Sequence, residues 1–328
     1  MEEALRAAQA AGELEGLHAV LVLKDGAVFA EAYFDGADEA WGRDLGVVAH
    51  GPDTLHDLRS VSKSITGLLY GIALEEGIVP GLDAPLYAGF PGHEALLEAD
   101  PRRAGILVRH ALTMTMGTDW DESLPYTDPR NSEIAMVLSP DPLAYVLSRD
   151  VIEAPGGRWT YSGGATALLG GLIERGSGMK LPDYAAAKLL EPLGITRWEW
   201  AEGPDGTPAA ASGLRLTARG LARIGEMILA GGAWDGAQVV PASWLEESFH
   251  PHVPLGELSY GLHWYMPAGG GAWVAGFGNG GQRFSVNPGM GLVMVVFAGL
   301  YNDFDAWRLP VKVSMEFLGP ALEAAAAR

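Results

Sequence analysis

The chain has 328 residues and a formal net charge of −19, from 41 acidic and 22 basic side chains. This charge argues against nucleic acid as a partner, because phosphate binding requires clustered Lys and Arg. The absence of cysteine excludes disulfides, thiolate metal sites and a cysteine nucleophile.

The sequence also lacks the features of a membrane or secreted protein. No uninterrupted run of roughly 18 apolar residues occurs, so we expect no transmembrane helix and no membrane partner. The first residues, Met1-Glu2-Glu3-Ala4, are acidic where a signal peptide would be basic. We therefore expect a cytoplasmic protein.

The first predicted element is a hairpin of two strands over residues 17–34, which alternate around the turn Lys24-Asp25-Gly26. A buried helix is then predicted near Ser60, because Ile65, Leu68, Leu69 and Ile72 recur at helical spacing. This helix is predicted over 60–76, and further helices over 141–149, 165–175, 182–190, 217–230 and 242–248.

The most informative segment is Ser60-Val61-Ser62-Lys63. Residues i and i+3 of a helix are neighbours, so the Lys63 amine can reach the Ser60 hydroxyl. The free N–H groups at a helix start also favour negative charge beside the serine. Ser60 is therefore a candidate covalent nucleophile with Lys63 as its base. A second Ser-x-x-Lys match, Ser177 to Lys180, lies between glycines after a predicted helix, where a loop without a fixed lysine is expected.

Three other segments are candidates for a site. The turn-rich segment 119–129 contains Tyr126 and is either a loop over a pocket or a surface loop with a packed Trp120. The Gly-rich segment 156–164 places Tyr161 just before a helix, either as a proton shuttle near a lysine or as an ordinary half-buried aromatic. The segment 276–282 is followed by a strand, so its G-x-G-x-x-G pattern does not indicate a dinucleotide site. It is either a connecting loop or a strand entry with free N–H groups for an oxyanion.

The chain ends with strands over 283–286 and 292–297, which flank the turn Asn287-Pro288-Gly289, and a helix over 310–327. Strands at both ends with helices between them predict an α+β fold, in which the two ends form one antiparallel sheet. We expect a single catalytic domain over 1–328, with a sheet subdomain of about 1–55 and 255–328. The helical, site-bearing region spans about 56–254.

Other chemistries have little support. No G-x-S-x-G elbow, H-E-x-x-H motif or Walker A loop occurs. The eight histidines are scattered along the chain, and the only close pair, His250 and His252, is expected in a surface loop rather than a zinc site. We expect no metal and no organic cofactor.

Taken in order, Ser60-x-x-Lys63, Tyr161-Ser162-Gly163 and Asn279-Gly280-Gly281-Gln282 resemble the three motifs of the penicillin-recognising serine hydrolases. Stretches at 111–117, 216–223 and 260–264 are similar too, so the resemblance runs from about 17 to 320. It is strongest to the class C β-lactamase-related branch, which includes family VIII carboxylesterases and 6-aminohexanoate-dimer hydrolases. It implies a β-lactamase/transpeptidase-like fold, with the site between an antiparallel sheet and a helical region.

The resemblance also implies roles for individual residues. Ser60 matches the acylated nucleophile, Lys63 its proton acceptor, and Tyr161 a tyrosine that moves protons during acylation and deacylation. The backbone N–H groups of Ser60 and Gln282 match the oxyanion hole. Asn279, Gly280, Gly281 and Gly163 match substrate-binding positions, and Tyr126 lies where the aminohexanoate-dimer hydrolases have a substrate-facing tyrosine. We expect Lys63 to be neutral, because it is desolvated beside Tyr161.

Two departures concern the substrate. Position 163 is Gly where the β-lactamases have Asn, and Asn279 stands where they have a lysine that holds the β-lactam carboxylate. We therefore expect a serine hydrolase that cleaves esters or amides of small acyl compounds. The alternatives are a β-lactamase, a D-amino-acid or oligomer amidase, and a non-catalytic acyl- or peptide-binding protein of the same fold.

Overall fold

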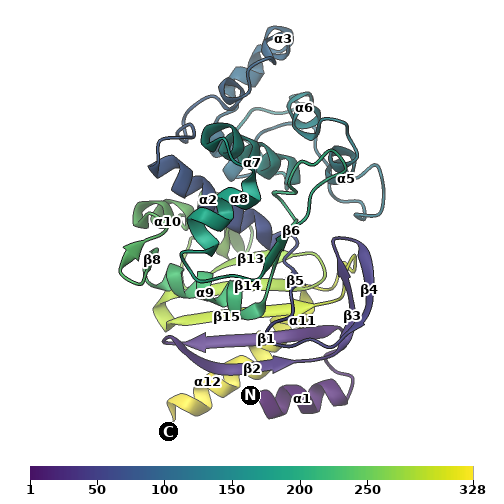
Figure 1. Ribbon diagram of the computed structural model, residues 1–328, viewed down its shortest axis with the longest axis vertical. Coiled ribbons are helices and arrows are strands. Elements are labelled where there is room, and N and C mark those ends of the chain that lie inside the picture. The colour runs from purple at the N-terminus through teal and green to yellow at the C-terminus, as the bar shows by residue number, and fades with distance from the viewer. Residues whose placement is uncertain (328) are drawn as a thin grey trace.

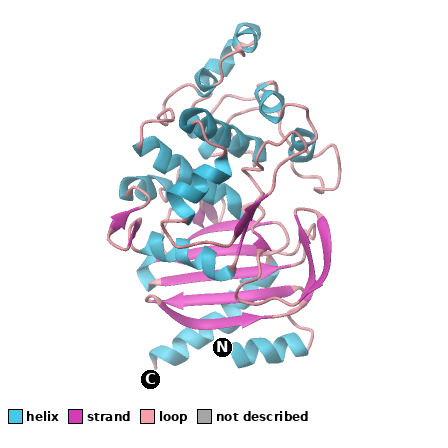
Figure 2. Ribbon diagram, viewed as in Figure 1, coloured by secondary structure: helices cyan, strands magenta, loops and turns pink. Residues whose placement is uncertain are grey.

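The computed structural model describes residues 1–327 and has an eight-stranded antiparallel sheet below a largely helical region (Figure 1). Figure 2 shows the strands gathered in the lower half and most helices above and around them. The α+β prediction is confirmed. In spatial order the strands are β10 (Val253–Leu255), β11 (Leu258–Tyr260), β12 (Tyr265–Pro267), β13 (Val274–Gly278), β14 (Gln282–Asn287), β15 (Leu292–Ala298), β1 (Leu17–Lys24) and β2 (Ala27–Tyr33).

The two ends of the chain meet at the centre of this sheet. Strand β1 pairs antiparallel with β15, with Val20 opposite Val296 and Val22 opposite Met294. Hairpins join β1 to β2 and β14 to β15. The predicted union of the terminal strands in one sheet is therefore correct.

Successive side chains of β1 point into two different hydrophobic cores on opposite faces of the sheet. Val20 and Val22 face a core built with helix α1 (Glu2–Ala10) and the C-terminal helices. Leu21 and Leu23 face the larger core, which continues into the helical region. Because successive residues of a strand point to opposite faces, one buried strand serves both cores.

The helical region is centred on α2 (Val61–Glu75) and α7 (Gly163–Ser177), which pack against each other. Every residue from Val61 to Ala73 is buried, as expected of a helix that is covered on all sides. The other helices are α3 (Glu94–Ala99), α4 (Val108–Leu112), α5 (Ser132–Val137), α6 (Pro142–Leu147), α8 (Leu181–Ala185), α9 (Ala218–Leu229) and α10 (Ala242–Ser248). None of the described helices is long and apolar enough to cross a membrane.

Short strands that the sequence did not predict form three small sheets apart from the large one. Strand β5 (His56–Asp57) pairs with β7 (Leu214–Leu216), and its last residue is followed at once by the turn that leads to Ser60. The remaining short strands are β3 (Gly36–Ala40), β4 (Arg43–Val48), β6 (Trp198–Trp200), β8 (Ala233–Trp234) and β9 (Ala237–Gln238).

The C-terminal helix is interrupted rather than continuous. It consists of α11 (Arg308–Lys312), a π-helical segment η5 (Val313–Leu318) and α12 (Gly319–Ala326). Pro320 lacks an N–H and its ring crowds the preceding turn, so the wider π-helical bonding just before it is the local accommodation.

Candidate active site

Ser60 is the N-cap residue of α2, at the junction between β5 and that helix. The chain turns at Arg59, which adopts the left-handed conformation with φ of 47°. Within residues 1–327 the Ser60 N–H has no hydrogen-bond acceptor. The serine therefore lies at a helix N-terminus with a free donor beside its hydroxyl, which favours negative charge there.

Lys63 is one turn further along α2, and its side chain is only 2% exposed. Its Nζ lies 3.0 Å from Ser60 Oγ, 3.2 Å from the Ala211 carbonyl oxygen and 3.7 Å from Glu133 Oε2. Burial lowers the pKa of Lys63, but the nearby Glu133 carboxylate, followed by interactions with Tyr161 and Glu122, outweighs it and holds the pKa above its usual value. The expectation of a neutral Lys63 is therefore wrong, because buried carboxylates compensate its charge.

Glu133, at the start of α5, is the acidic partner of Lys63 and is 4% exposed. Its Oε1 accepts a hydrogen bond from Ser212 Oγ at 3.0 Å, whereas its buried Oε2 has no donor among the described residues. A Cβ atom on Gly163 would lie 2.5 Å from this Oε2. Glu133 therefore occupies the space that a side chain at position 163 would need.

Glu122 forms a second acidic position behind the site. Its Oε1 accepts from the Gly163 N–H at 2.5 Å and from Trp120 Nε1 at 2.7 Å, and its Oε2 accepts from the Tyr126 hydroxyl at 2.8 Å. Burial, and then the nearby charge of Glu133, raise the pKa of Glu122 to about 7. Its proton occupancy therefore changes near neutral pH.

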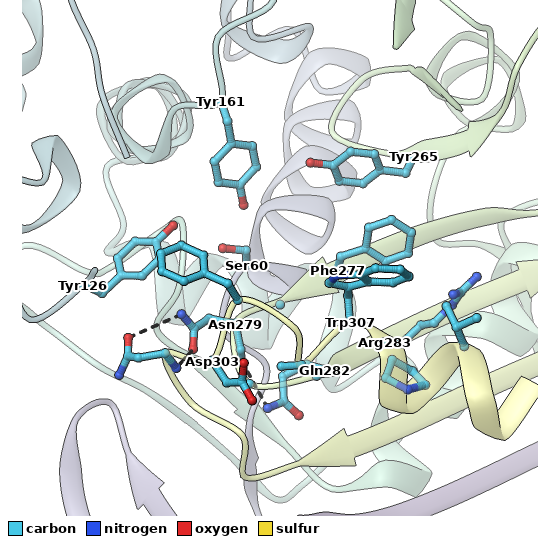
Figure 3. A pocket seen from close by; sticks show the side chains of 18 of the residues that line it. Ser60, Tyr126, Tyr161, Tyr265, Phe277, Asn279, Gln282, Arg283, Asp303 and Trp307 are labelled. Carbon is cyan, nitrogen blue, oxygen red and sulfur yellow. Dashed lines mark hydrogen bonds between the residues drawn. The ribbon is translucent and has the colours of Figure 1, made fainter. Parts of the chain in front are cut away.

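Tyr161 completes the group around the serine. Its hydroxyl points toward Ser60 (Figure 3), and the Lys63 ammonium lies 4.8 Å from the centre of its ring. Burial raises the pKa of Tyr161, and the opposing effect of Lys63 does not cancel the increase. The hydroxyl is thus a proton carrier within reach of the serine, held in its protonated form.

The turn between β13 and β14 forms the wall beside Ser60. A Cβ atom on Gly278 would lie 2.5 Å from the Leu58 carbonyl oxygen, so only glycine lets this strand lie against the start of α2. The Gln282 side chain anchors the turn, because its Nε2 donates to the Ala298 oxygen at 2.6 Å. Asn279 is tied to the next loop, because its Oδ1 accepts from the Asn302 N–H at 2.8 Å.

These groups lie at a pocket of about 650 Å³. Ser60, Tyr161 and Tyr126 lie on one side of it, and aromatic side chains of the sheet and of the C-terminal segment line the rest (Figure 3). The main apolar lining residues are Leu124, Tyr265, Trp273, Phe277, Phe304, Trp307, Val311 and Met315. The C-terminal helix thus forms part of the pocket, which the sequence did not predict.

Arg283 is the one strong cation among the described residues that line this pocket. Its guanidinium lies 5.1 Å from the centre of the Phe277 ring and 5.3 Å from that of Trp273, and its Nε donates to Ser285 Oγ. Burial lowers the pKa of Arg283 to about 10, and no carboxylate of residues 1–327 forms an ion pair with it. The pocket therefore combines apolar walls with a guanidinium that has no ion-pair partner, and its acidic lining residues are Glu122 and Asp303.

Most of the candidate residues from the sequence lie together here. Ser60, Tyr161, Tyr126 and the segment 279–282 line the pocket, with Lys63 directly behind Ser60. Gly163 does not line it but lies behind Tyr161, covered by Glu122 and Glu133.

The second Ser-x-x-Lys match lies elsewhere. Ser177 is the last residue of α7 rather than part of a loop, and its hydroxyl donates to the Ile173 carbonyl at 2.7 Å. Lys180 instead contacts Glu202 and the Gly206 carbonyl. Glu122, Glu133 and Arg283 were not predicted as site residues, because no local pattern in the sequence distinguishes them from ordinary charged residues.

Comparison with known proteins identifies a family and several relatives. The β-lactamase family model matches residues 1–306. A 6-aminohexanoate-dimer hydrolase from Paenarthrobacter ureafaciens is 27% identical in an alignment of 306 positions that covers 84% of this chain and 71% of the relative.

Solved structures show the same fold. A Bacillus anthracis structure named as a 6-aminohexanoate-dimer hydrolase has a TM-score of 0.78 at 18% identity, covering 97% of this chain and 82% of its own. EstCE1, a hydrolase with promiscuous acyltransferase activity, has a TM-score of 0.72 at 17% identity, covering 94% of this chain and 96% of its own.

Proposed function

Because the chain belongs to the β-lactamase family of serine hydrolases, we propose that it cleaves esters or amides of small acyl compounds through an acyl-enzyme on Ser60. The observation that carries this proposal is the 3.0 Å contact between Ser60 Oγ and Lys63 Nζ beside the 650 Å³ pocket. A nucleophile, its proton acceptor and an adjacent pocket are the minimum that acyl transfer requires.

Acylation begins with a proton shift inside the buried pair. Lys63 is an ammonium in the resting protein, so it must release a proton before it can accept one from Ser60. Glu133 Oε2, 3.7 Å away and without a hydrogen-bond donor, is the acceptor for that proton. Ser60 Oγ then bonds to the substrate carbonyl carbon while its own proton passes to Lys63 Nζ.

The remaining steps use Tyr161 and two backbone donors. The N–H groups of Ser60 and Gln282 hold the oxyanion, and loss of one such donor typically costs ~10²–10³ in rate. Tyr161 passes a proton from Lys63 to the departing alkoxide or amine as the carbonyl–heteroatom bond breaks. In deacylation the same groups take a proton from water, whose oxygen attacks the acyl carbon, and return one to Ser60 Oγ. Glu133 then returns its proton to Lys63, which restores the resting pair.

The pocket favours a substrate with an apolar body and an acidic group. Aromatic walls bind the apolar part, and Arg283, on the side opposite Tyr126 in Figure 3, is available to a carboxylate. Asn279 carries no charge and is held by Asn302, so it does not replace the carboxylate-binding lysine of β-lactamases. The relative named as a 6-aminohexanoate-dimer hydrolase supports an amide of an amino-acid oligomer as the second candidate substrate.

A fluorophosphonate probe followed by mass spectrometry of the folded protein tests the nucleophile. We expect one adduct, on Ser60, which disappears in Ser60→Ala and persists in the matched control Ser177→Ala. Turnover of p-nitrophenyl butyrate and of a 6-aminohexanoate dimer should exceed turnover of nitrocefin. An unlabelled Ser60 would support the non-catalytic binding protein instead, and rapid nitrocefin hydrolysis would make the chain a β-lactamase.

A further inference from the structure

Three histidines that are distant in the sequence meet beside the large sheet. They are His18 on β1, His50 after β4 and His56 on β5, and Asp38 of β3 lies against them. The His18 and His50 rings stack with their centres 4.2 Å apart. The exposed fraction is 1% for His18 and 4% for Asp38. The histidines are scattered along the sequence, but the fold brings these three together.

The hydrogen bonds fix which ring nitrogens are free. His56 Nδ1 lies 3.0 Å from the Asp57 carbonyl oxygen, which can only accept, so Nδ1 carries the proton and His56 Nε2 has a lone pair. His18 Nδ1 lies 2.9 Å from that Nε2 and therefore donates to it. His18 must then present a lone pair at its Nε2, which is buried and has no partner among the described residues.

Two further buried atoms near His18 Nε2 are also without partners. Asp38 Oδ1 accepts from the Tyr301 hydroxyl at 2.8 Å, but its Oδ2 accepts from no donor in residues 1–327. His50 Nε2 likewise has no hydrogen-bond partner among the described residues. His18, Asp38 and His50 each offer a ligand atom, and these three atoms lie within 4.8 Å of one another. Leaving a buried polar atom unpaired costs ~1–3 kcal/mol, so three converging examples require an explanation.

We propose that His18 Nε2, His50 Nε2 and Asp38 Oδ2 bind a divalent cation of the Zn²⁺ class. Two imidazoles and one carboxylate are a ligand set that zinc takes, with bonds of about 2.0–2.2 Å. Ligand atoms around a tetrahedral zinc lie roughly 3.3 Å apart, so binding requires the spacing to close by about an ångström and the stacked His18 and His50 rings to rotate until both lone pairs point at the ion. The hydrogen bond from His18 Nδ1 to His56 is the kind of second contact that orients a ligating histidine.

Charge and shape both fit a cation. Burial lowers the pKa of His18 to about 3 and also lowers the pKa of His50, so both rings are neutral and their lone pairs are available. Burial opposes ionisation of Asp38, but His56 and the Tyr301 hydroxyl hold its pKa below the usual value. A Cβ atom on Gly36 would lie 2.4 Å from His18 Nε2, so glycine keeps the approach to this nitrogen open.

The cation site lies next to the elements that hold the nucleophile. Tyr301, which bonds Asp38, also lies under the Arg59 guanidinium, 4.9 Å from its ring centre. Arg59 directly precedes Ser60, and its Nε lies 3.1 Å from Asp57 Oδ2. A metal ion here would join β1, the β3–β4 hairpin and, through His56, the strand that leads to Ser60. Its role is therefore structural: it holds the approach to the nucleophile without contacting substrate.

The test uses the purified full chain after removal of metal with dipicolinate and dialysis. Titration with ZnCl₂, followed by calorimetry and elemental analysis, should give one Zn²⁺ per chain, and the melting temperature should rise with added Zn²⁺. We expect His50→Gln and Asp38→Asn to lose at least tenfold in Zn²⁺ affinity, whereas the control His252→Gln keeps the wild-type affinity.

A second measurement on the wild-type chain remains informative if a variant fails to fold. CoCl₂ added to the metal-free protein should give the intense visible absorption of a four-coordinate site, with water as the fourth ligand, and X-ray absorption of the Zn²⁺ form should show two imidazole ligands. Absence of stoichiometric binding, or binding that survives both substitutions, would overturn the proposal.

Discussion

Glu133 holds its carboxylate Oε2 3.7 Å from the Lys63 ammonium, in space that is open only because residue 163 is glycine. The pair is almost fully buried, with side-chain exposures of 2% for Lys63 and 5% for Glu133. Burying an ion pair costs desolvation free energy. Removing one partner leaves the other charge buried and uncompensated. The protonation state of Lys63, which contacts Ser60, therefore depends on Glu133 and Gly163, which are both far from it in the sequence.

The first prediction concerns Glu133→Gln. Without the carboxylate, the largest effect that raises the pKa of Lys63 is gone, so burial lowers this pKa and the proton is lost to solvent as the pH rises rather than to an internal acceptor. We expect kcat/KM to fall about 10²-fold at pH 6, with the loss shrinking to less than tenfold by pH 9, because deprotonation becomes easier as the pH rises. The measurement is a pH profile for both proteins with one p-nitrophenyl ester. A loss that is the same at every pH would indicate a purely structural role for Glu133.

The second prediction is a double-mutant cycle at position 163. In Gly163→Ala the new Cβ would lie 2.5 Å from Glu133 Oε2, so we expect a destabilisation of about 1–3 kcal/mol from overpacking. Glu133→Ala in the same chain removes the clash, and the double variant should lose less stability than the sum of the single variants. Urea unfolding of the four proteins gives the coupling free energy. Simple additivity would mean that another neighbour limits the size of residue 163.

The third prediction concerns Tyr161→Phe, which removes the hydroxyl that points toward Ser60. We expect kcat to fall by ~10²–10⁴, the usual contribution of a positioned proton donor or acceptor, with little change in KM. The matched control is Tyr184→Phe, which removes a hydroxyl bonded to Glu76 and leaves the pocket intact. Equal losses in the two variants would assign the effect to folding rather than proton transfer.

Local patterns in the sequence were sufficient to predict the sheet that joins the chain ends and the helix that begins at Ser60. Alternation in residues 17–34 and helical spacing after Ser60 are signals carried by neighbouring residues, and β1 and α2 follow them. The pockets and charges that these elements create were harder to predict. The C-terminal segment lines the pocket with Trp307, just before α11, and with Met315 of the π-helical segment, and no local periodicity specifies these placements.

The two acidic residues of the site also could not be predicted from local patterns. Glu122 lies in a turn-rich loop and Glu133 in the first turn of a short helix, and both positions are ordinary for exposed glutamates. They are buried only because the loop 119–131 folds back over α7, through contacts such as that between Glu122 and the Gly163 N–H. Lys63 could not be given the correct protonation state without them.

The fourth prediction tests the substrate specificity proposed for Arg283. The wild-type protein should prefer a p-nitrophenyl monoester of a dicarboxylic acid over the same compound with its free acid methylated. In Arg283→Met this preference should fall ~10–100-fold, the range expected for loss of one charged hydrogen bond of about 1.5–3 kcal/mol. Arg283→Lys, measured alongside, keeps the positive charge but lacks the planar guanidinium, so it distinguishes loss of charge from loss of guanidinium geometry. An unchanged preference in Arg283→Met would remove this residue from substrate recognition.

The last prediction concerns pH-dependent stability at Glu122. Its carboxyl has a pKa of about 7 in the folded protein, raised mainly by burial, against 4.5 as the reference value. The folded state therefore binds the proton more tightly than the unfolded state, so this group stabilises the fold less as pH rises from 4.5 to 7. Relative to Glu122→Gln, the free energy of unfolding of the wild-type protein should fall by about 1–3 kcal/mol between pH 5 and pH 8. Urea unfolding of both proteins at the two pH values measures this difference. The exposed Glu98→Gln is the control and should show no comparable change, and a difference at Glu122 that is constant, or grows toward low pH, would contradict the assignment.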